Sequence, residues 1–177
     1  MDAVRIFIFY EFDPCKLMKN ELNITYELYD NDAALEAKDL ALLILAREAS
    51  AGAYAPYSKF LVGAAAMLNN GKIITGTNQE NASYPVGICA ERVLLSAAAV
   101  LHPNEPRARL AISYSNLNGL SDKPISPCGI CRQSLLEYEE RMKQGFKIIM
   151  SGLTGKILII SSAAALLPFS FGSSDLA

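Results

Sequence analysis

Strand-like and helix-like segments alternate along this chain, and this alternation limits its possible folds more than any other feature. Apolar residues at helical spacing follow Asn31 and predict a helix over residues 31–53 that ends near Gly52. The segments FLVGAAAML (60–68) and IITGT (73–77) flank the turn NNGK and predict a β-hairpin. FKIIMSGLTGKILII (146–160) predicts a second pair of strands around a turn.

Two more helices are expected, one starting at Cys89 and one at Cys128, with the strand ARLAISYS (108–115) between them. Strands and helices in this order favour a mixed sheet with helices on both faces. The expected fold class is therefore α/β, a three-layer α/β/α domain. A chain of 177 residues, 51% of them hydrophobic, is long enough to bury the core of one such domain.

Charge and apolar runs exclude several classes of partner. A net charge of −2 gives no electrostatic reason to expect nucleic acid or an anionic membrane surface. The longest apolar runs fall short of the roughly 18–20 residues needed to span a bilayer. The first residues lack a basic stretch and a cleavage site, and the four cysteines lack a disulfide-framework spacing. We therefore expect a cytoplasmic protein.

Three of the cysteines occur at predicted helix starts. Cys89 begins one helix, while Cys128 and Cys131 lie three positions apart in PCGIC and share one face of the other. Helix N-termini lower thiol pKa values, and thiolate is the form that binds zinc. Three ligands would leave one coordination position open, as in catalytic zinc sites. The alternatives are a redox or chance CxxC pair, or a fourth ligand from Cys15.

Glu91 follows Cys89 by two positions, in the first turn of the same predicted helix. From there its carboxylate could carry protons at the open zinc position without being a ligand. The alternative is that glutamate is simply favourable in the first turn of a helix. That alternative does not explain its coincidence with Cys89 and with the later PCxxC.

These residues, with the sequence around them, resemble the cytidine deaminases, specifically the small homotetrameric zinc enzymes of pyrimidine salvage. The matching segments are YAPYSKFLVGAAA, GTNQENASYPVGICAER, ISPCGICRQ and LLPFSFGSSDL. The resemblance implies one Zn²⁺ per subunit on Cys89, Cys128 and Cys131, with Glu91 as the catalytic proton shuttle. The implied reaction is hydrolytic deamination of cytidine and deoxycytidine to uridine and deoxyuridine.

The resemblance also implies substrate-binding residues. Asn78 and Glu80 would hydrogen-bond the sugar hydroxyls, and Phe60 would lie against the pyrimidine. Tyr84 and Phe171 would reach into the site of a neighbouring subunit, so that the tetramer shares its active sites. In the structural alternative, the two phenylalanines are core aromatics, Tyr84 anchors a loop, and Asn78 and Glu80 are turn and surface residues.

Arg92 has a rationale of its own. Zinc with three thiolates has a formal charge of −1, and a guanidinium donating to the sulfurs would restore Lewis acidity. The alternative is a surface arginine. A cysteine in place of histidine at position 89 argues against deaminases of the H-x-E type. The rivals are a deaminase of another aminopyrimidine nucleoside and a zinc-stabilised binding protein.

Residues 1–30 lie outside the resemblance, which covers the deaminase domain at 31–177. VRIFIFY (4–10) and ITYELY (24–29) have the composition and alternation of strands. We expect this extension to add a strand or hairpin to the edge of the sheet.

Overall fold

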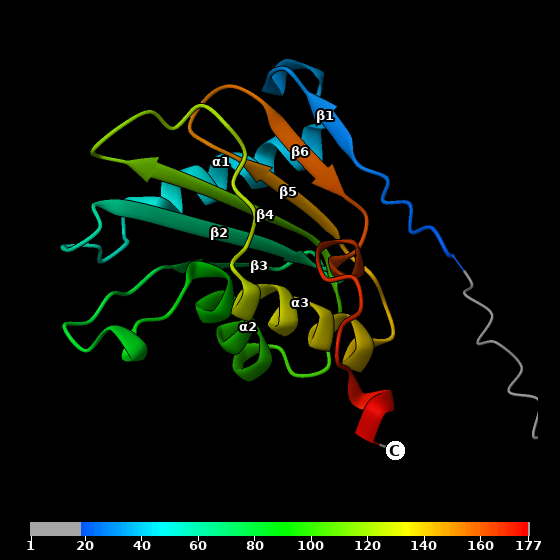
Figure 1. Ribbon diagram of the computed structural model, residues 1–177. Helices are drawn as coiled ribbons and strands as arrows, with labels where there is room; N and C mark the ends of the chain where they lie inside the picture. The colour runs from blue at the N-terminus through cyan, green and yellow to red at the C-terminus, as the bar shows by residue number, and fades with distance from the viewer. Residues whose placement is uncertain (1–18, 177) are drawn as a thin grey trace, which may run out of the picture.

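The computed structural model describes residues 19–176, and a mixed sheet runs through the centre of this part of the chain (Figure 1). The strand order is β1-β6-β5-β4-β2-β3; β4 and β5 are parallel, and all other neighbours are antiparallel. The strands are β1 (Glu27–Tyr29), β2 (Phe60–Leu68), β3 (Ile73–Thr77), β4 (Arg107–Asn116), β5 (Lys147–Ser151) and β6 (Ile157–Ile160). Both predicted hairpins are confirmed.

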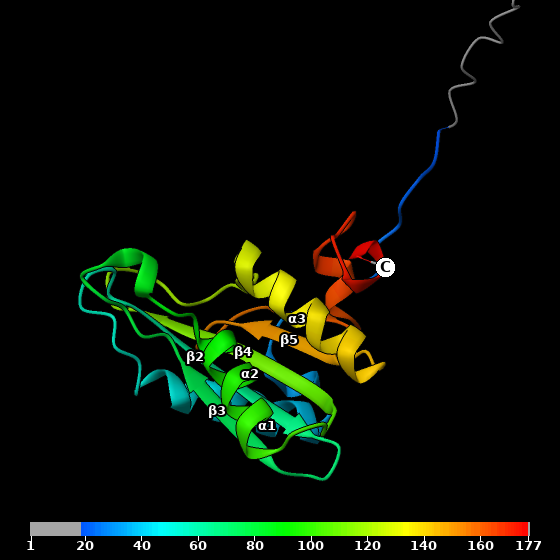
Figure 2. The same cartoon turned by 90° about the horizontal axis from the view of Figure 1, so that it is seen from below.

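Helices cover both faces of the sheet, which confirms the predicted α/β fold. Helix α1 (Ala37–Ser50) covers one face, and α2 (Ala90–Leu101) and α3 (Gly129–Met142) cover the other (Figures 1 and 2). One buried cluster joins α1 to the sheet through residues such as Leu43 and Ile149. A second cluster joins α2 and α3 to the opposite face through residues such as Leu94 and Leu135.

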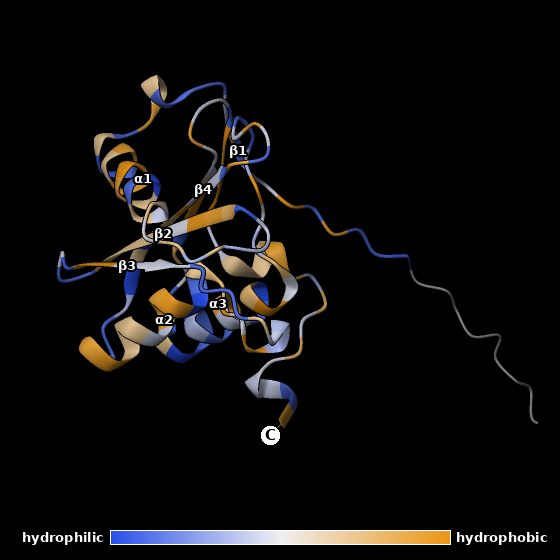
Figure 3. Ribbon diagram, turned by 90° about the vertical axis from the view of Figure 1, so that its left-hand side faces the viewer, coloured by the Kyte–Doolittle hydropathy of each residue, from blue (hydrophilic) through white to orange (hydrophobic). Residues whose placement is uncertain are grey.

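The central strands read as continuous apolar runs because both of their faces are covered. β2 has buried or half-buried residues throughout, whereas the edge strand β3 alternates between exposed and buried positions. Among the helices, α3 is the richest in polar residues, and Figure 3 shows it in mostly pale and blue colours. Its polar side chains make contacts that matter for the site described below.

Two glycines bring helices close to the sheet. A Cβ atom at Gly63 would lie 2.1 Å from the Ala46 carbonyl oxygen of α1. A Cβ atom at Gly76 would lie 2.5 Å from the Ala90 carbonyl oxygen at the start of α2. These separations are far below van der Waals contact, so only glycine lets each helix lie this close to the strand.

A β-bulge near the start of β4 points two arginines to opposite faces of the sheet. Met67 pairs with Arg109 and Leu68 pairs with Arg107, so one residue of β4 has no partner on β2. Arg109 and Lys147 form ion pairs with the buried Asp39 of α1. Arg107 instead stacks over a ring on the α3 face, with its guanidinium carbon 4.2 Å from the Tyr138 centroid.

The predictions for the N-terminal third were only partly correct. The expected helix over 31–53 is split: a 3₁₀ turn (Asp32–Ala34) is capped by the Asn31 side chain, and α1 begins at Ala37. Leu35 is extended between the two and packs against the core under α1. Of ITYELY only β1 is a strand, and it pairs with β6. The other expected strand, VRIFIFY (4–10), lies outside the described residues.

The remaining short elements are 3₁₀ helices at Tyr84–Val86, Ala163–Leu166 and Ser173–Leu176. The last two follow β6 in the chain. Over residues 19–176, no helix has both the length and the apolar character needed to cross a membrane.

Candidate metal centre

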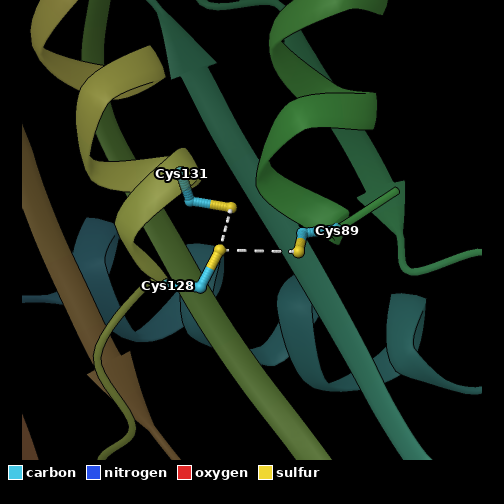
Figure 4. Close-up of side chains that lie close together, drawn as sticks. All are labelled: Cys89, Cys128 and Cys131. Carbon is cyan, nitrogen blue, oxygen red and sulfur yellow. Dashed lines mark hydrogen bonds between the residues drawn. The ribbon is translucent and has the colours of Figure 1, made fainter. Parts of the chain in front are cut away.

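Three cysteine side chains meet where α2 and α3 begin. Cys89 is the N-cap residue of α2, Cys128 is the N-cap residue of α3, and Cys131 lies in the first turn of α3. Figure 4 shows the three side chains pointing toward one another from the two helices. The sulfur atoms of Cys89 and Cys128 are 3.8 Å apart, and those of Cys128 and Cys131 are 3.4 Å apart. The predicted convergence of these thiols is therefore observed.

The spacing of the sulfur atoms fits a tetrahedral zinc ion. With Zn–S bonds of about 2.3 Å, tetrahedral geometry places pairs of sulfur ligands roughly 3.8 Å apart. All three sulfur atoms lie within 4.8 Å of one another, so a single ion can contact them together. In the part of the chain that the structure describes, no other group of three histidine, cysteine or acidic side chains converges in this way. Three thiolates are soft ligands of the kind that zinc prefers.

The electrostatics of the triad favour a thiolate. A hydrogen bond from the Cys131 thiol lowers the pKa of Cys89 to about 6, although partial burial opposes the shift. The same hydrogen bond raises the pKa of Cys131, which is fully buried. Cys89 therefore loses its proton near neutral pH and offers a thiolate as the first ligand.

Glu91 is buried beside the triad. Glu91 is only 4% exposed, and this desolvation raises the pKa of its carboxyl group. The negative charge of Glu91 contributes an upward shift to the pKa values of both Cys89 and Cys131. A carboxyl group whose pKa is raised by burial is a stronger base than an exposed one, which suits a group that takes up and passes on protons.

Arg92 lies next to Glu91 on α2, and its positive charge contributes to the lowered pKa of Cys89. Its side chain lines a groove between α2 and α3 together with Leu95, Ser96 and Tyr138. Within residues 19–176, no hydrogen bond joins its guanidinium to a cysteine sulfur. The observed influence of Arg92 on the triad is therefore one of charge.

Phe60, Asn78 and Glu80 lie close together, where β2 begins and β3 ends. The Asn78 side chain accepts a hydrogen bond from the Val62 amide at 2.7 Å and donates one to the Phe60 carbonyl at 2.9 Å. Glu80 accepts hydrogen bonds from the amides of Tyr57 and Ser58. A hydrogen bond from the Ser58 side chain, these two amide bonds and the nearby positive charge of Lys59 together lower the pKa of the Glu80 carboxyl group. Both polar side chains thus fix the backbone around Phe60.

The Phe60 ring lines a cavity of about 510 Å³ with Asn116, Asp122 and Lys123. Its other partner is Tyr114, a buried residue that the sequence analysis missed: the two rings stack with centroids 4.7 Å apart. The alternation of β4 could have identified Tyr114 as inward-facing, but not its contact with β2.

Tyr84 and Phe171 are both largely exposed, at 74% and 59%. Tyr84 packs edge-on against Tyr57, with ring centroids 5.8 Å apart. Phe171 lies in the C-terminal segment, and its carbonyl accepts a hydrogen bond from Gln133 of α3 at 2.8 Å. Neither aromatic residue is buried, so Phe171 is not the core aromatic of the structural alternative.

Comparisons with known proteins agree with this geometry. Residues 36–144 match the family described as the cytidine and deoxycytidylate deaminase zinc-binding region. A cytidine deaminase of Halalkalibacterium halodurans is 37% identical over 129 residues, which cover 73% of this chain and 90% of that protein. A cytidine deaminase of Mycobacterium tuberculosis is 44% identical over 93 residues, which cover 52% of this chain and 65% of that protein.

Solved structures show the same similarity. The crystal structure of cytidine deaminase from Burkholderia pseudomallei superposes with a TM-score of 0.64 at 39% sequence identity. The match covers 97% of that chain but 74% of this one, so part of the present chain has no counterpart there.

Proposed function

The chain belongs to the cytidine and deoxycytidylate deaminase family, and from this we propose that it deaminates cytidine and deoxycytidine by hydrolysis. The products would be uridine or deoxyuridine and ammonia, a reaction of pyrimidine salvage. The observation that carries the proposal is the buried Glu91 carboxyl group beside three converging thiols. A zinc-stabilised binding protein would have no use for a buried carboxyl group at this place.

Cys89, Cys128 and Cys131 would hold one Zn²⁺ per subunit. When bound there, zinc supplies the Lewis acidity that makes water a nucleophile at neutral pH. Glu91 accepts the proton of the attacking water and delivers it to N3 of the pyrimidine ring as a bond forms to C4. Glu91 then takes the proton of the new C4 hydroxyl group and passes it to the amino group, so that C4 becomes a carbonyl, the C4–N bond breaks and ammonia leaves.

Phe60, Asn78 and Glu80 would bind the nucleoside. Asn78 and Glu80 already hold the backbone at Phe60, but an amide nitrogen donates two hydrogen bonds and a carboxylate accepts about four. Their remaining capacity suits two adjacent sugar hydroxyls. The face of Phe60 that lines the cavity would lie against the pyrimidine, and Arg92 would support the charge balance of the thiolates.

We further propose a homotetramer with shared active sites, in which Tyr84 and Phe171 complete the site of a neighbouring subunit. Their exposure supports this arrangement, because large apolar side chains at a subunit surface gain most from burial in an interface. The deaminase domain would span residues 31–177. The three reduced thiols that zinc requires favour a cytoplasmic location.

The decisive variant is Glu91→Gln. We expect it to keep zinc in stoichiometric amount, because the cysteines are unchanged, and to lose turnover by about 10²–10⁴-fold. The assay is the fall in cytidine absorbance with the zinc-loaded protein, and metal analysis confirms the loading. Glu137→Gln, an exposed position of α3, is the matched control and should retain full activity.

Full activity of the Glu91→Gln variant would reject the proton-shuttle role. Ammonia release from another aminopyrimidine nucleoside, with none from cytidine, would show that the substrate belongs to the alternative class. Stoichiometric zinc without ammonia release from any member of a nucleoside panel would favour a binding protein.

A further inference from the structure

Arg132 follows Cys131 directly, and its guanidinium makes three hydrogen bonds in three directions. Nε donates to the Pro127 carbonyl at 2.9 Å, and one terminal nitrogen donates to the Ser126 hydroxyl at 2.9 Å. The other terminal nitrogen donates to the Leu166 carbonyl at 3.1 Å. Two of the acceptors thus lie just before Cys128, and the third lies in a distant part of the chain.

The distant acceptor belongs to the C-terminal segment, defined here as residues 162–173. Polar side chains of α3 hold this segment along its length. Gln133 donates to the Phe171 carbonyl, Glu139 accepts from the Ser162 hydroxyl and the Ala163 amide, and Glu140 accepts from the Ser173 amide. The helix that carries two of the three thiols therefore also positions the segment that carries Phe171.

We propose that Arg132 is a positioning residue that joins the metal centre to the C-terminal segment. Its guanidinium fixes the turn that presents Cys128 and, through the same planar group, fixes Leu166. Metal binding and the placement of Phe171 then depend on each other. Because Phe171 is proposed to complete a neighbour's site, metal in one subunit would support substrate binding in the next. This last step rests on the proposed function.

Arginine suits this role and lysine does not. A guanidinium spreads its donors over three nitrogens in a fixed planar fork, so it reaches acceptors on different sides of the group. The three donors of an ammonium group share one nitrogen at the end of a flexible stem and do not reproduce this geometry. Groups that support metal ligands typically change metal affinity by about 10–100-fold when they are altered. Coupling between two sites is reciprocal, so order in the C-terminal segment should also respond to the metal.

The first test compares Arg132→Lys and Arg132→Gln with the wild-type protein. We expect both variants to release zinc to a competing chelator about tenfold faster or more, and to show faster amide hydrogen exchange over residues 162–173. Arg141→Lys is the control: this residue is also on α3, where its guanidinium stacks on the Tyr138 ring, and it should leave both readouts unchanged. Unchanged zinc release in both Arg132 variants would overturn the proposal.

The second test needs no substitution. Removing zinc from the wild-type protein should speed amide exchange over residues 162–173, while exchange in β5 and β6 stays slow and shows that the sheet remains folded. Equal exchange of the C-terminal segment with and without zinc would refute the coupling. Neither test measures turnover, so the coupling can fail while the deaminase assignment stands, and the reverse also holds.

A third variant alters the C-terminal segment without altering Arg132 at the metal centre. Gln133→Ala removes only the bond to the Phe171 carbonyl and leaves the three Arg132 bonds in place. We therefore expect zinc release to speed up less than in the Arg132 variants, together with a several-fold rise in the KM for cytidine. A fall in kcat with no change in KM would contradict the assigned path through Phe171.

Discussion

Glu139 offers a quantitative test of how the C-terminal segment is held to the domain. Glu139 is a buried residue, 7% exposed, and its carboxylate joins three parts of the chain. One oxygen accepts hydrogen bonds from the Phe146 amide at 3.0 Å and the Ala163 amide at 2.9 Å. The other accepts one from the Ser162 hydroxyl at 2.7 Å. No sequence pattern indicates this role.

The Glu139→Ala variant should lose about 2–5 kcal/mol of unfolding free energy. Each of the two amide groups would become a buried donor without a partner, at a cost of about 1–3 kcal/mol. Removing a buried carboxylate also removes its desolvation penalty, which offsets part of the loss. Glu139→Gln keeps one acceptor oxygen and should cost less than the alanine variant.

Denaturant unfolding at neutral pH measures this difference directly. Glu137→Ala, two positions away on the exposed side of α3, is the control and should change stability by less than about 0.5 kcal/mol. The assigned role would be refuted by a Glu139→Ala variant as stable as the control. Equal losses of unfolding free energy in the alanine and glutamine variants would show that the hydrogen bonds from the Phe146 and Ala163 amides are not the source of the stability.

Two further substitutions test other parts of the domain. Gly76→Ala would press a Cβ atom against the Ala90 carbonyl of α2, so we expect it to lower the free energy of unfolding, measured by heat or denaturant, by about 1–3 kcal/mol. Gly52→Ala is the control and should be tolerated, because the nearest atom to its Cβ would be 3.5 Å away. The hydrogen bond from Arg47 lowers the pKa of Asp32 in the folded protein. The ionised Asp32 therefore stabilises the fold at pH values above about 3.8, the pKa of this group in the unfolded chain. This stabilisation is lost as the pH falls through the lower pKa of the folded state. Asp32→Asn should therefore cost less than about 1 kcal/mol at pH 7, because the pair is partly exposed. The difference in stability from wild type should shrink as the pH falls below about 3.8, and a difference that stays constant would contradict this reasoning.

Local patterns were sufficient to predict the elements of the fold. The hairpin of β2 and β3, the strand β4 and the starts of α2 and α3 all lie where periodicity and turn residues indicate. The convergence of the three thiols was also predictable, since helix starts that share a metal ion must meet. The family resemblance added the proposed roles of Phe60 and Phe171, which no local pattern predicts.

Contacts between distant segments were not predictable from these patterns. The pairing of β1 with β6 depends on the three-dimensional path of more than a hundred intervening residues. Arg132 stands in the same CRQ stretch as a proposed ligand, but its acceptor Leu166 is 34 positions away. The hydrogen bonds of Asn78 to the backbone of β2 were also not predicted, because the sequence does not indicate which groups an amide side chain will bind.

The bulge in β4 has a consequence for how this chain can change. Arg107 and Arg109 are two positions apart and would share a face in a regular strand, yet they contact Tyr138 and Asp39 in opposite layers. Deleting Ala108 would remove the extra residue, and Arg107 and Arg109 would become neighbours in a regular strand that still point to opposite faces. A chain one residue shorter at this point should therefore keep the contacts of Arg107 with Tyr138 and of Arg109 with Asp39.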